Sequence, residues 1–382
     1  MHETPAGVDH RYVKLLATDC LTGALTEFRL ERSRVSTAMT RGTKANHFYG
    51  PAWTDLQCNG FAGIDFNHPE VTPVEVCQAV RAIWATGCAT VLPTIITSGP
   101  DQIEHLFRVL VKAREIDPAV RDSVPGFHLE GPFISHVDGA RGAHPLEHVR
   151  TPDLRLWRRW QKAAGGLIRM ITLAPEVPKA LAFIQKVANE GVEVAIGHTM
   201  AGAREVRQAA DAGARLSTHL GNGCPQTLHR HENPIMAQLG EDRLTATLIP
   251  DGIHLPAHVL RSFVRAKTPL RSIIVTDAMA AAGAPPGRYT LAGRALEVGP
   301  DRVVRQPGQP NFAGSALTMN EAVSNYAAFT GESLGASWLA GSTRADQAIS
   351  HRSSATVIAR KECSKLVPVV LMRKRRVLWA AE

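Results

Sequence analysis

The sequence has 382 residues, of which 44% are hydrophobic, and it carries a formal charge of +8. This length and apolar content are enough for one large buried core with a smaller module beside it, or for two domains of medium size. No run reaches the roughly 20 apolar residues that a membrane span requires, and the first residues lack the pattern of a secretory signal. The six cysteines form no CxxC pair, which is typical of buried thiols in a reducing compartment. We therefore expect a cytoplasmic protein that does not contact membranes.

The positive charge raises the question of a nucleic-acid partner. The densest basic run, Arg373 to Arg376, lies inside the segment 367–379, which the pattern predicts to be a β-hairpin with a charged turn. Aromatic residues are few and are not interleaved with the basic ones, as a base-stacking surface would need. We expect no nucleic-acid partner, and an anionic small substrate or simple solubility explains the charge.

The first 50 residues contain alternating stretches such as Leu25–Glu31, which predict short antiparallel strands. The segment after about residue 345 contains similar material. We expect residues 1–50 and 346–382 to combine into a small β-sandwich module, and residues 51–345 to form a separate domain.

Between these ends, eight apolar runs have the length of strands. They are Pro51–Gln57, Thr90–Ile96, Gly126–Glu130, Ile168–Ala174, Glu193–His198, Arg215–His219, Leu244–Pro250 and Ser272–Asp277. Amphipathic patterns between them predict helices, clearest at 73–86, 180–189 and 203–212. In the first of these we expect Val74, Val76, Val80 and Ile83 to face inward. Eight alternating βα units indicate a (β/α)₈ barrel, in which catalytic groups come from the C-terminal strand ends.

Three residues at predicted strand ends are candidate metal ligands: Glu130, His198 and His219. Zinc prefers imidazole nitrogen and carboxylate oxygen, and a catalytic site leaves one position open. A single histidine in such a place is more often a core or loop residue, but three candidates at strand ends favour a metal site. We expect one divalent ion, with zinc as first choice and iron or another ion as alternatives.

Asp277 ends the last predicted strand, where a carboxylate could act first as a general base and then as a general acid. The alternative is an N-cap for residues 278–282. His128 shares a strand face with Glu130, and we interpret it as an interior histidine rather than a support for the site. The long polar loop 131–145 could return His144 over the site to polarise a carbonyl.

Asn222, Gly223, Arg230 and His254 are candidates for binding an anionic group. The cluster His229–His231 could equally be solvated surface, and composition does not choose between these possibilities.

At these residues the chain resembles the N-acetylglucosamine-6-phosphate deacetylase family of the amidohydrolase superfamily. The matching stretches occur in the family's order and lie at 55–60, 128–132, 142–145, 197–199, 218–222, 251–254, 276–278 and 313–319. Together they cover roughly residues 50 to 325.

The resemblance implies roles for residues across the predicted site. It implies Glu130, His198 and His219 as metal ligands, Asp277 as the catalytic base and acid, and His144 as a contact of the substrate amide. It also implies a substrate-binding set made of Ala143, Asn222, Gly223, Arg230, His254, Phe312, Ala313 and Gly314. In the family an arginine from the neighbouring subunit completes the phosphate site, and Arg230 matches it, which implies a homodimer.

The sequence departs from the expected pattern at three places, one of which is the N-terminal region, where little family signature is present. Superfamily members with two metals carry His-x-His on the first strand, where this chain has Gln57 and Asn59. Amide side chains are poor metal ligands beside imidazole, so we expect a single metal. The sequence of the loop Gly221-Asn-Gly-Cys-Pro225 also differs from the one more common in the family.

The resemblance implies a metal-dependent hydrolase that removes acetyl from N-acetyl-D-glucosamine 6-phosphate in amino-sugar catabolism. Alternatives are a deacetylase of N-acetylgalactosamine 6-phosphate, a deacetylase of an unphosphorylated N-acetyl amino sugar, and a non-catalytic sugar-phosphate sensor. An amidohydrolase that opens cyclic amides is disfavoured by the series of sugar-deacetylase motifs.

Overall fold

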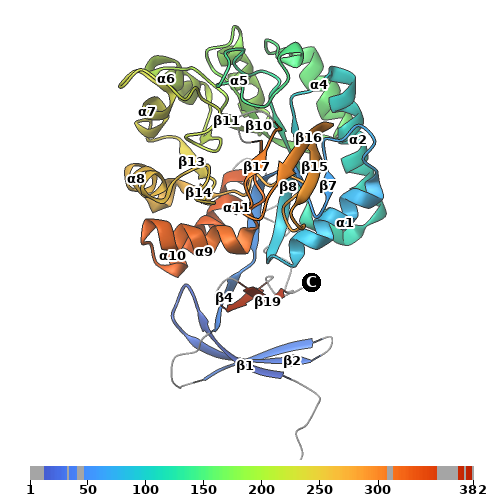
Figure 1. Ribbon diagram of the computed structural model, residues 1–382, viewed down its shortest axis with the longest axis vertical. Helices are drawn as coiled ribbons and strands as arrows, with labels where there is room; N and C mark the ends of the chain where they lie inside the picture. Colours follow the sequence, from blue (N-terminus) through green and yellow to red (C-terminus); the bar gives the residue numbers. More distant parts are fainter. Residues whose placement is uncertain are drawn as a thin grey trace, which may run out of the picture.

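Eight parallel strands form the central sheet of the protein (Figure 1). The computed structural model describes residues 13–31, 34–40, 47–307, 313–350, 369–373 and 376–380. The central strands are β5 (Trp53–Cys58), β8 (Cys88–Ile96), β9 (Phe127–Glu130), β10 (Ile168–Leu173), β11 (Glu193–Ile196), β12 (Leu216–Ser217), β13 (Thr245–Leu248) and β14 (Ser272–Ile274). Each strand pairs with its neighbour in chain order from β5 to β14. The eight strands and the barrel fold predicted from the sequence are confirmed.

The two outer strands of this sheet meet just beyond their ends. The backbone N–H of Asp277 donates to the carbonyl of Gln57 at 3.0 Å, and that of Asn59 donates to the carbonyl of Ala278 at 2.6 Å. These hydrogen bonds close the sheet along a seam between the segments that follow β14 and continue β5. The C-terminal strand ends therefore lie on one rim, where the active sites of such barrels lie.

Helices surround the barrel. They are α1 (Pro73–Trp84), α2 (Pro100–Ile116), α3 (Pro118–Ser123), α4 (Leu154–Ala163), α5 (Ala180–Asn189), α6 (Ala203–Ala212), α7 (Pro234–Leu239), α8 (Ala257–Lys267), α9 (Met319–Thr330), α10 (Leu334–Ala340) and α11 (Thr343–Ser350). The three helices predicted from the sequence are present, with α5 and α6 at the predicted bounds.

One inward position in α1 was predicted wrongly. Val76, Val80 and Ile83 are buried, but the side chain of Val74 is 57% exposed. Successive residues in a helix are about 100° apart, so Val74 and Val76 point to nearly opposite sides. Val74 belongs to the solvent face of the first turn.

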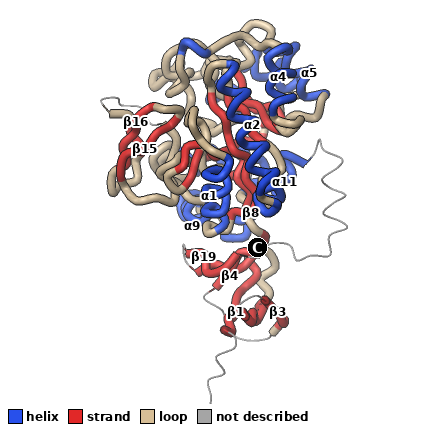
Figure 2. The backbone as a smooth tube through the Cα atoms, turned by 90° about the vertical axis from the view of Figure 1, so that its right-hand side faces the viewer, coloured by secondary structure: helices blue, strands red, loops and turns tan. Residues whose placement is uncertain are grey.

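Strands from both ends of the chain form the second unit, a six-stranded sheet at the far end of the barrel (Figures 1 and 2). Its strands are β1 (Val13–Asp19), β2 (Leu25–Glu31), β3 (Arg34–Met39), β4 (His47–Pro51), β18 (Val369–Arg373) and β19 (Arg376–Ala380). Strand β18 pairs antiparallel with β4 and with β19, so the flanking module and the C-terminal hairpin are confirmed. The described strands of the module form a single sheet. Because β4 leads into β5, the module adjoins the N-terminal end of that strand.

The junction between the two units is held by a tryptophan of α10. The ring of Trp338 lies 4.7 Å from that of Trp53, and its Nε1–H donates to the carbonyl of Pro51 at 2.7 Å. The next helix, α11, is tied to the barrel, since the hydroxyl of Thr54 donates to Asp346 at 2.6 Å. The boundary expected between residues 345 and 346 falls inside α11, and the domain limits stay a prediction.

A small antiparallel sheet that the sequence did not predict lies beside the rim formed by the C-terminal strand ends. It consists of β15 (Gly287–Leu291), β16 (Arg294–Val298) and β17 (Val304–Arg305). Its buried leucines and valines form a second hydrophobic cluster with rim residues such as Ile96 and Met279. We call β15, β16 and β17 the rim sheet. A short hairpin of β6 (Gly60–Phe61) and β7 (Ile64–Asp65) and two 3-10 turns, η1 (Leu146–His148) and η2 (Pro269–Arg271), complete the described elements.

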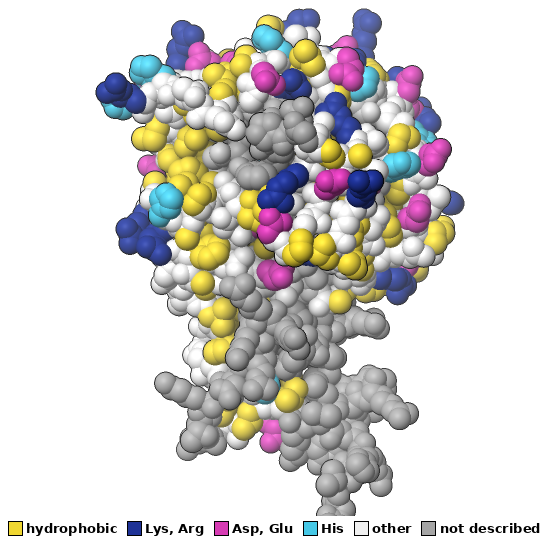
Figure 3. All heavy atoms as spheres, in the orientation of Figure 1, with side chains coloured by type: hydrophobic (Ala, Val, Ile, Leu, Met, Phe, Trp, Pro, Cys, Tyr) yellow, Lys and Arg dark blue, Asp and Glu magenta, His cyan; other side chains and the backbone are white. Residues whose placement is uncertain are grey.

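Within the described residues, no helix combines the length and the apolar character needed to cross a membrane. On the face drawn in Figure 3, basic and acidic side chains are interspersed over the barrel.

Candidate functional site

Three side chains at or just beyond the ends of β9, β11 and β12 converge on one point of the rim. Oε1 of Glu130, at the end of β9, lies 3.2 Å from Nε2 of His198 and 2.9 Å from Nε2 of His219. The two imidazole nitrogens are 3.1 Å apart. All three side chains are buried. The sequence predicted this group, and the fold brings it together.

Hydrogen bonds around these rings test whether a cation fits among them. Nδ1 of His198 lies 3.0 Å from the carbonyl of Ala140, so it carries a proton and donates it. Nε2 of that ring then presents a lone pair toward Glu130 and His219 when the imidazole is neutral. The Glu130 carboxylate and the His198 lone pair at such distances need a proton or a cation among them, and either a proton on Nε2 of His219 or a bound cation supplies it. The donor set of one carboxylate and two imidazoles fits a zinc-class divalent ion.

The charges of this group are strongly coupled. Burial alone would raise the pKa of Glu130, but hydrogen bonds from His198 and His219 hold it well below its usual range. Burial opposes protonation of His219, yet the hydrogen bond and charge of Glu130 raise the pKa of that imidazole. Glu130 is therefore a permanent carboxylate at neutral pH.

Asp277 lies beside this group, after β14, and its side chain is 8% exposed. Burial, reinforced by the charge of Glu130, raises the pKa of Asp277 to about 6. A carboxyl group with such a pKa can exchange a proton near neutral pH. Residues 278–282 form no helix, so the N-cap alternative does not apply.

Two amide side chains hold Asp277 in place. Nδ2 of Asn59 donates to its Oδ1 at 2.8 Å, and Nε2 of Gln57 donates to the same oxygen at 3.1 Å. Gln57 also donates to Oε1 of Glu130 at 2.9 Å. The positions that would hold a second metal therefore supply hydrogen-bond donors to the two carboxylates.

His144 returns over the site from the loop after β9, as predicted. Its ring centroid lies 4.3 Å from that of His198, and its Nδ1 lies 2.7 Å from the hydroxyl of Thr97. Burial holds the pKa of His144 well below its usual range, so the ring is neutral.

The tautomer of His144 decides what its Nε2 can do. If Thr97 donates to Nδ1, Nε2–H can donate to a substrate carbonyl. In the other tautomer Nε2 presents a lone pair, and ligand atoms of Glu130, His144 and His198 lie within 4.8 Å of one another. Its position thus suits either a carbonyl contact or a metal ligand.

A cavity of about 420 Å³ opens in front of these groups. Its walls include the predicted binding residues Ala143, Asn222, Gly223, His254, Ala313 and Gly314, with Asn59, Glu130, His144, His198, His219 and Asp277. Arg230 is exposed and does not line this cavity within the single chain. Phe312 lies outside the described residues.

His128 is an interior histidine, as interpreted from the sequence. It is fully buried, and its ring nitrogens lie 3.3 Å from the hydroxyl of Thr94 and 2.8 Å from that of Thr172. Burial lowers its pKa to about 4. The ring therefore fills the barrel interior as a neutral group beneath Glu130.

Three of the site residues have a backbone conformation that the sequence did not signal. His198, His219 and Asp277 have φ values of +50°, +30° and +48°, which residues other than glycine rarely adopt. The strands that precede them end at Ile196, Ser217 and Ile274, two or three residues earlier. Such strained residues persist at functional sites because the surrounding fold holds them.

A closed (β/α)₈ barrel with this rim chemistry defines an amidohydrolase-type TIM-barrel hydrolase. No protein-family model matches the chain. The chain is 37% identical over 279 residues to the N-acetylglucosamine-6-phosphate deacetylase of Lysinibacillus sphaericus, covering 73% of this chain and 70% of that protein. It is 33% identical over 285 residues to the N-acetylgalactosamine-6-phosphate deacetylase of Escherichia coli O157:H7, covering 74% and 72%.

A solved structure resembles the whole chain. An aspartate-to-alanine mutant of the N-acetyl-D-glucosamine-6-phosphate deacetylase of Mycobacterium smegmatis, in complex with N-acetyl-D-glucosamine-6-phosphate, superposes with a TM-score of 0.82. The two are 26% identical, and the match covers 97% of this chain and 98% of that one. The protein belongs to the N-acetylglucosamine-6-phosphate deacetylase family.

Proposed function

We propose that the protein hydrolyses the acetamide of N-acetyl-D-glucosamine 6-phosphate to glucosamine 6-phosphate and acetate. The observation that carries the proposal is the convergence of Glu130, His198 and His219 beside the buried Asp277. The family supplies the substrate class, and the cavity supplies the room for a sugar phosphate.

Glu130, His198 and His219 would hold one divalent ion, with zinc as first choice. When bound, the ion supplies a Lewis acid that polarises the amide carbonyl and lowers the pKa of water. Gln57 and Asn59 stand where a pair of imidazoles would bind a second ion, which supports a single-metal site.

Asp277 takes the proton of the attacking water and then delivers it to the departing nitrogen. Its Oδ1 accepts hydrogen bonds from Asn59 and Gln57, so Oδ2 is the oxygen left to carry the proton. His144 contacts the amide carbonyl through Nε2.

Asn222, Gly223 and His254 bind the sugar and its phosphate, and Ala143, Phe312, Ala313 and Gly314 line the sugar. Nδ1 of His254 donates to Asp251 at 2.6 Å, which fixes the ring where it faces the cavity. Arg230 completes the phosphate site of the partner subunit in a homodimer. The exposure of Arg230 outside its own chain's cavity supports this role.

A second candidate substrate is N-acetylgalactosamine 6-phosphate, because a relative of similar identity carries that activity in its name. The two sugars differ only in the direction of one hydroxyl. Both reactions use the same metal and the same base.

Acetate release from both sugar phosphates and from unphosphorylated N-acetylglucosamine, each with a chelator control, tests the proposal. Chelator-sensitive turnover that prefers a phosphorylated sugar is the expected result. Turnover of the unphosphorylated sugar alone would show that the enzyme does not use a phosphate site. No turnover by metal-loaded protein would overturn the deacetylase assignment, and no bound metal would favour the sensor.

A mixing experiment tests the dimer. Subunits carrying Asp277→Asn and subunits carrying Arg230→Ala are each expected to have low activity. After mixing, the Arg230→Ala subunit has its own Asp277 and receives Arg230 from its partner, so about a quarter of all sites regain function. No recovery in verified mixed dimers would mean that Arg230 does not act across the interface.

We place the protein in the cytoplasm. The cysteines of the described residues, among them Cys58, Cys77 and Cys88, are all free thiols, which supports a reducing compartment. Fractionation of cells that express the chain tests this assignment.

A further inference from the structure

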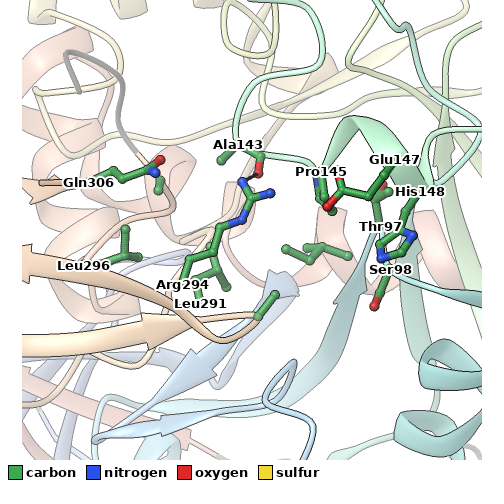
Figure 4. Close-up of a pocket in the computed structure, with 13 residues that line it drawn as sticks. Thr97, Ser98, Ala143, Pro145, Glu147, His148, Leu291, Arg294, Leu296 and Gln306 are labelled. Carbon is green, nitrogen blue, oxygen red and sulfur yellow. Dashed lines mark hydrogen bonds between the residues drawn. The ribbon is translucent and has the colours of Figure 1, made fainter. Parts of the chain in front are cut away.

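A second, smaller chamber lies beside the catalytic cavity, between the rim sheet and the loop that carries His144 (Figure 4). Its volume is about 140 Å³. It is lined by Ile96, Thr97, Ser98, Ala143, Pro145, Glu147, His148, Leu291, Ala292, Arg294, Leu296, Gln306 and Ala313. We call it the side chamber. Ile96, Ala143, Leu291 and Ala313 line both spaces, so the side chamber adjoins the catalytic cavity at these four residues.

One wall of the side chamber carries a guanidinium that has no acidic partner among the described residues. Nη1 of Arg294, on β16, donates to the carbonyl of Ala143 at 2.7 Å. Among the described residues, no carboxylate oxygen lies within 4.0 Å of this guanidinium. By contrast, Arg288 on the adjacent strand β15 pairs with Glu297 at 3.1 Å.

The remaining polar groups are spread around the chamber. Figure 4 shows Gln306 on one side of Arg294, with Glu147, Thr97 and His148 across the chamber. Glu147 is exposed, whereas Arg294 is only partly exposed. The side of the chamber formed by the rim sheet therefore favours an anion, because the guanidinium retains donors that the contact with Ala143 does not use.

The side chamber also adjoins the support of His144, the residue that contacts the amide carbonyl in the proposed reaction. Thr97 lines it, and the hydroxyl of Thr97 is the partner of Nδ1 of His144 at 2.7 Å. In the proposed reaction His144 faces the carbonyl, and the sugar extends toward Asn222 and His254. The acyl chain leaves the carbonyl carbon on the side away from the sugar nitrogen, and we place it against Ile96 and Leu291, which line both spaces.

We infer that the side chamber accepts an anionic extension of the N-acyl group, so that the enzyme also hydrolyses half-amides of short dicarboxylic acids on the amino-sugar phosphate. The inference depends on the proposed deacetylase function. An N-succinyl group fits the space, since a cavity of about 150 Å³ accommodates a benzene-sized group. The carboxylate of the chain binds Arg294.

The added chemistry is the same balanced hydrolysis. Water forms a bond to the acyl carbon, the carbon–nitrogen bond breaks, and the nitrogen takes the proton carried by Asp277. The products are the amino-sugar phosphate and the dicarboxylate, and no oxidant or further reactant is needed.

The test compares three amides of glucosamine 6-phosphate with the full-length, metal-loaded protein: N-acetyl, N-succinyl and N-succinamyl. The last replaces the terminal carboxylate by a neutral amide of the same size. We expect kcat/KM for the succinyl substrate to exceed that for the succinamyl substrate by about tenfold or more, as for a charge-assisted hydrogen bond. Equal values, or no hydrolysis of the succinyl substrate when the acetyl substrate is hydrolysed, would overturn the inference and leave the deacetylase intact.

Substitutions in the rim sheet test whether Arg294 causes the preference for the succinyl over the succinamyl substrate. Arg294→Met should reduce the succinyl-to-succinamyl ratio to near one, and Arg294→Lys should retain part of it. Arg288→Met removes an arginine from the same sheet and should leave the ratio unchanged. Because each ratio is taken within one variant, a general loss of activity cancels. A preference that survives Arg294→Met would overturn the role of Arg294.

Binding gives a readout that does not depend on turnover. With the Asp277→Asn variant, the succinyl amide should bind about tenfold or more tightly than the succinamyl amide, and adding Arg294→Met should abolish this difference. If no acyl substrate is hydrolysed but this binding difference is present, the proposed function fails while the anion site stands.

A carboxylate that binds Arg294 can be attached either to the acyl chain or to the sugar of the substrate. N-acetylglucosamine 6-phosphate with a carboxymethyl ether at C3 distinguishes these sources. An Arg294-dependent preference for this ether, without one for the succinyl amide, would overturn the acyl-chain assignment.

Discussion

The side-chain amide of Asn59 donates a hydrogen bond to Oδ1 of Asp277 across the seam of the barrel, with 2.8 Å between the two atoms. Asn59 follows β5 and Asp277 follows β14, so this contact joins the first and last strands of the barrel where the chemistry takes place. The amide fixes one carboxylate oxygen and leaves the other toward the cavity. A residue that departs from the two-metal pattern thus orients the candidate base.

Replacement of Asn59 by leucine should lower kcat by about tenfold or more, because a hydrogen bond to a charged group is lost. The substitution removes the donor but keeps a similar volume. The ligand set is untouched, so the metal content measured by elemental analysis should stay at the wild-type level. Joint loss of metal and activity would instead make Asn59 part of the metal site.

Asp277→Asn should keep the metal and the fold but lose turnover by about 10²- to 10⁴-fold, the range expected for a general acid–base group. The substitution preserves shape and removes the proton acceptor. Single-turnover rates and metal stoichiometry measured on the same sample check this prediction. Near-wild-type rates would take Asp277 out of the mechanism.

Removal of the metal should abolish activity and lower the melting temperature. An ion that binds only the folded state at a thousand times its dissociation constant adds about 4 kcal/mol of stability. Glu130→Gln should make the melting temperature insensitive to chelator, since the anionic ligand is gone. Glu115→Gln, at an exposed position, serves as the control and should respond to chelator as the wild type does. A chelator response in Glu130→Gln equal to that of the wild type would exclude Glu130 as a ligand.

Lys267, which lies outside the candidate metal site, makes a pH-dependent contribution to the free energy of unfolding. Its side chain is fully buried, and its ammonium donates to the carbonyl of Glu241 at 2.7 Å. Burial, reinforced by the charge of Arg271, lowers its pKa from 10.5 to about 8. Between these two values the unfolded chain holds a proton that the folded chain has released, so the free energy of unfolding rises with pH.

Urea denaturation from pH 7 to 10.5 checks this effect. Relative to Lys267→Met, the wild type should gain on the order of 1 to 3 kcal/mol over the range. Lys112→Met, at an exposed lysine, should follow the wild type. Parallel curves for the wild type and Lys267→Met would show that the buried amine titrates alike in both states.

The barrel could be predicted from the sequence because strand and helix periodicities repeat along it. Helices α5 and α6 have the predicted bounds, and all eight predicted strands are present. The position of Glu130 at a strand end followed from the apolar run before it. His198 and His219 were expected as the last residues of strands, but the backbone turns away earlier. Their left-handed conformations depend on the surrounding fold and leave no signal in a single sequence.

The rim sheet could not be predicted for a different reason. Strand β15 begins with Gly287 and is largely exposed, and β17 has two residues. Such short strands gain stability from burial against Ile96, which is distant in the sequence. Tertiary contacts of this kind override the weak local preference. The side chamber and the position of Arg294 were therefore accessible only from the structure.

The pairing of β18 with β4 has a consequence for biosynthesis. The two strands lie on either side of the barrel in the chain, and Val370 is opposite Gly50. During translation, the whole barrel is therefore synthesised after β4 and before β18, the strand that pairs with β4 on its other side. Until then the edge of β4 that β18 will cover is open to other extended chains. Nascent chains truncated before residue 369 should be the species that associate with chaperones or with one another.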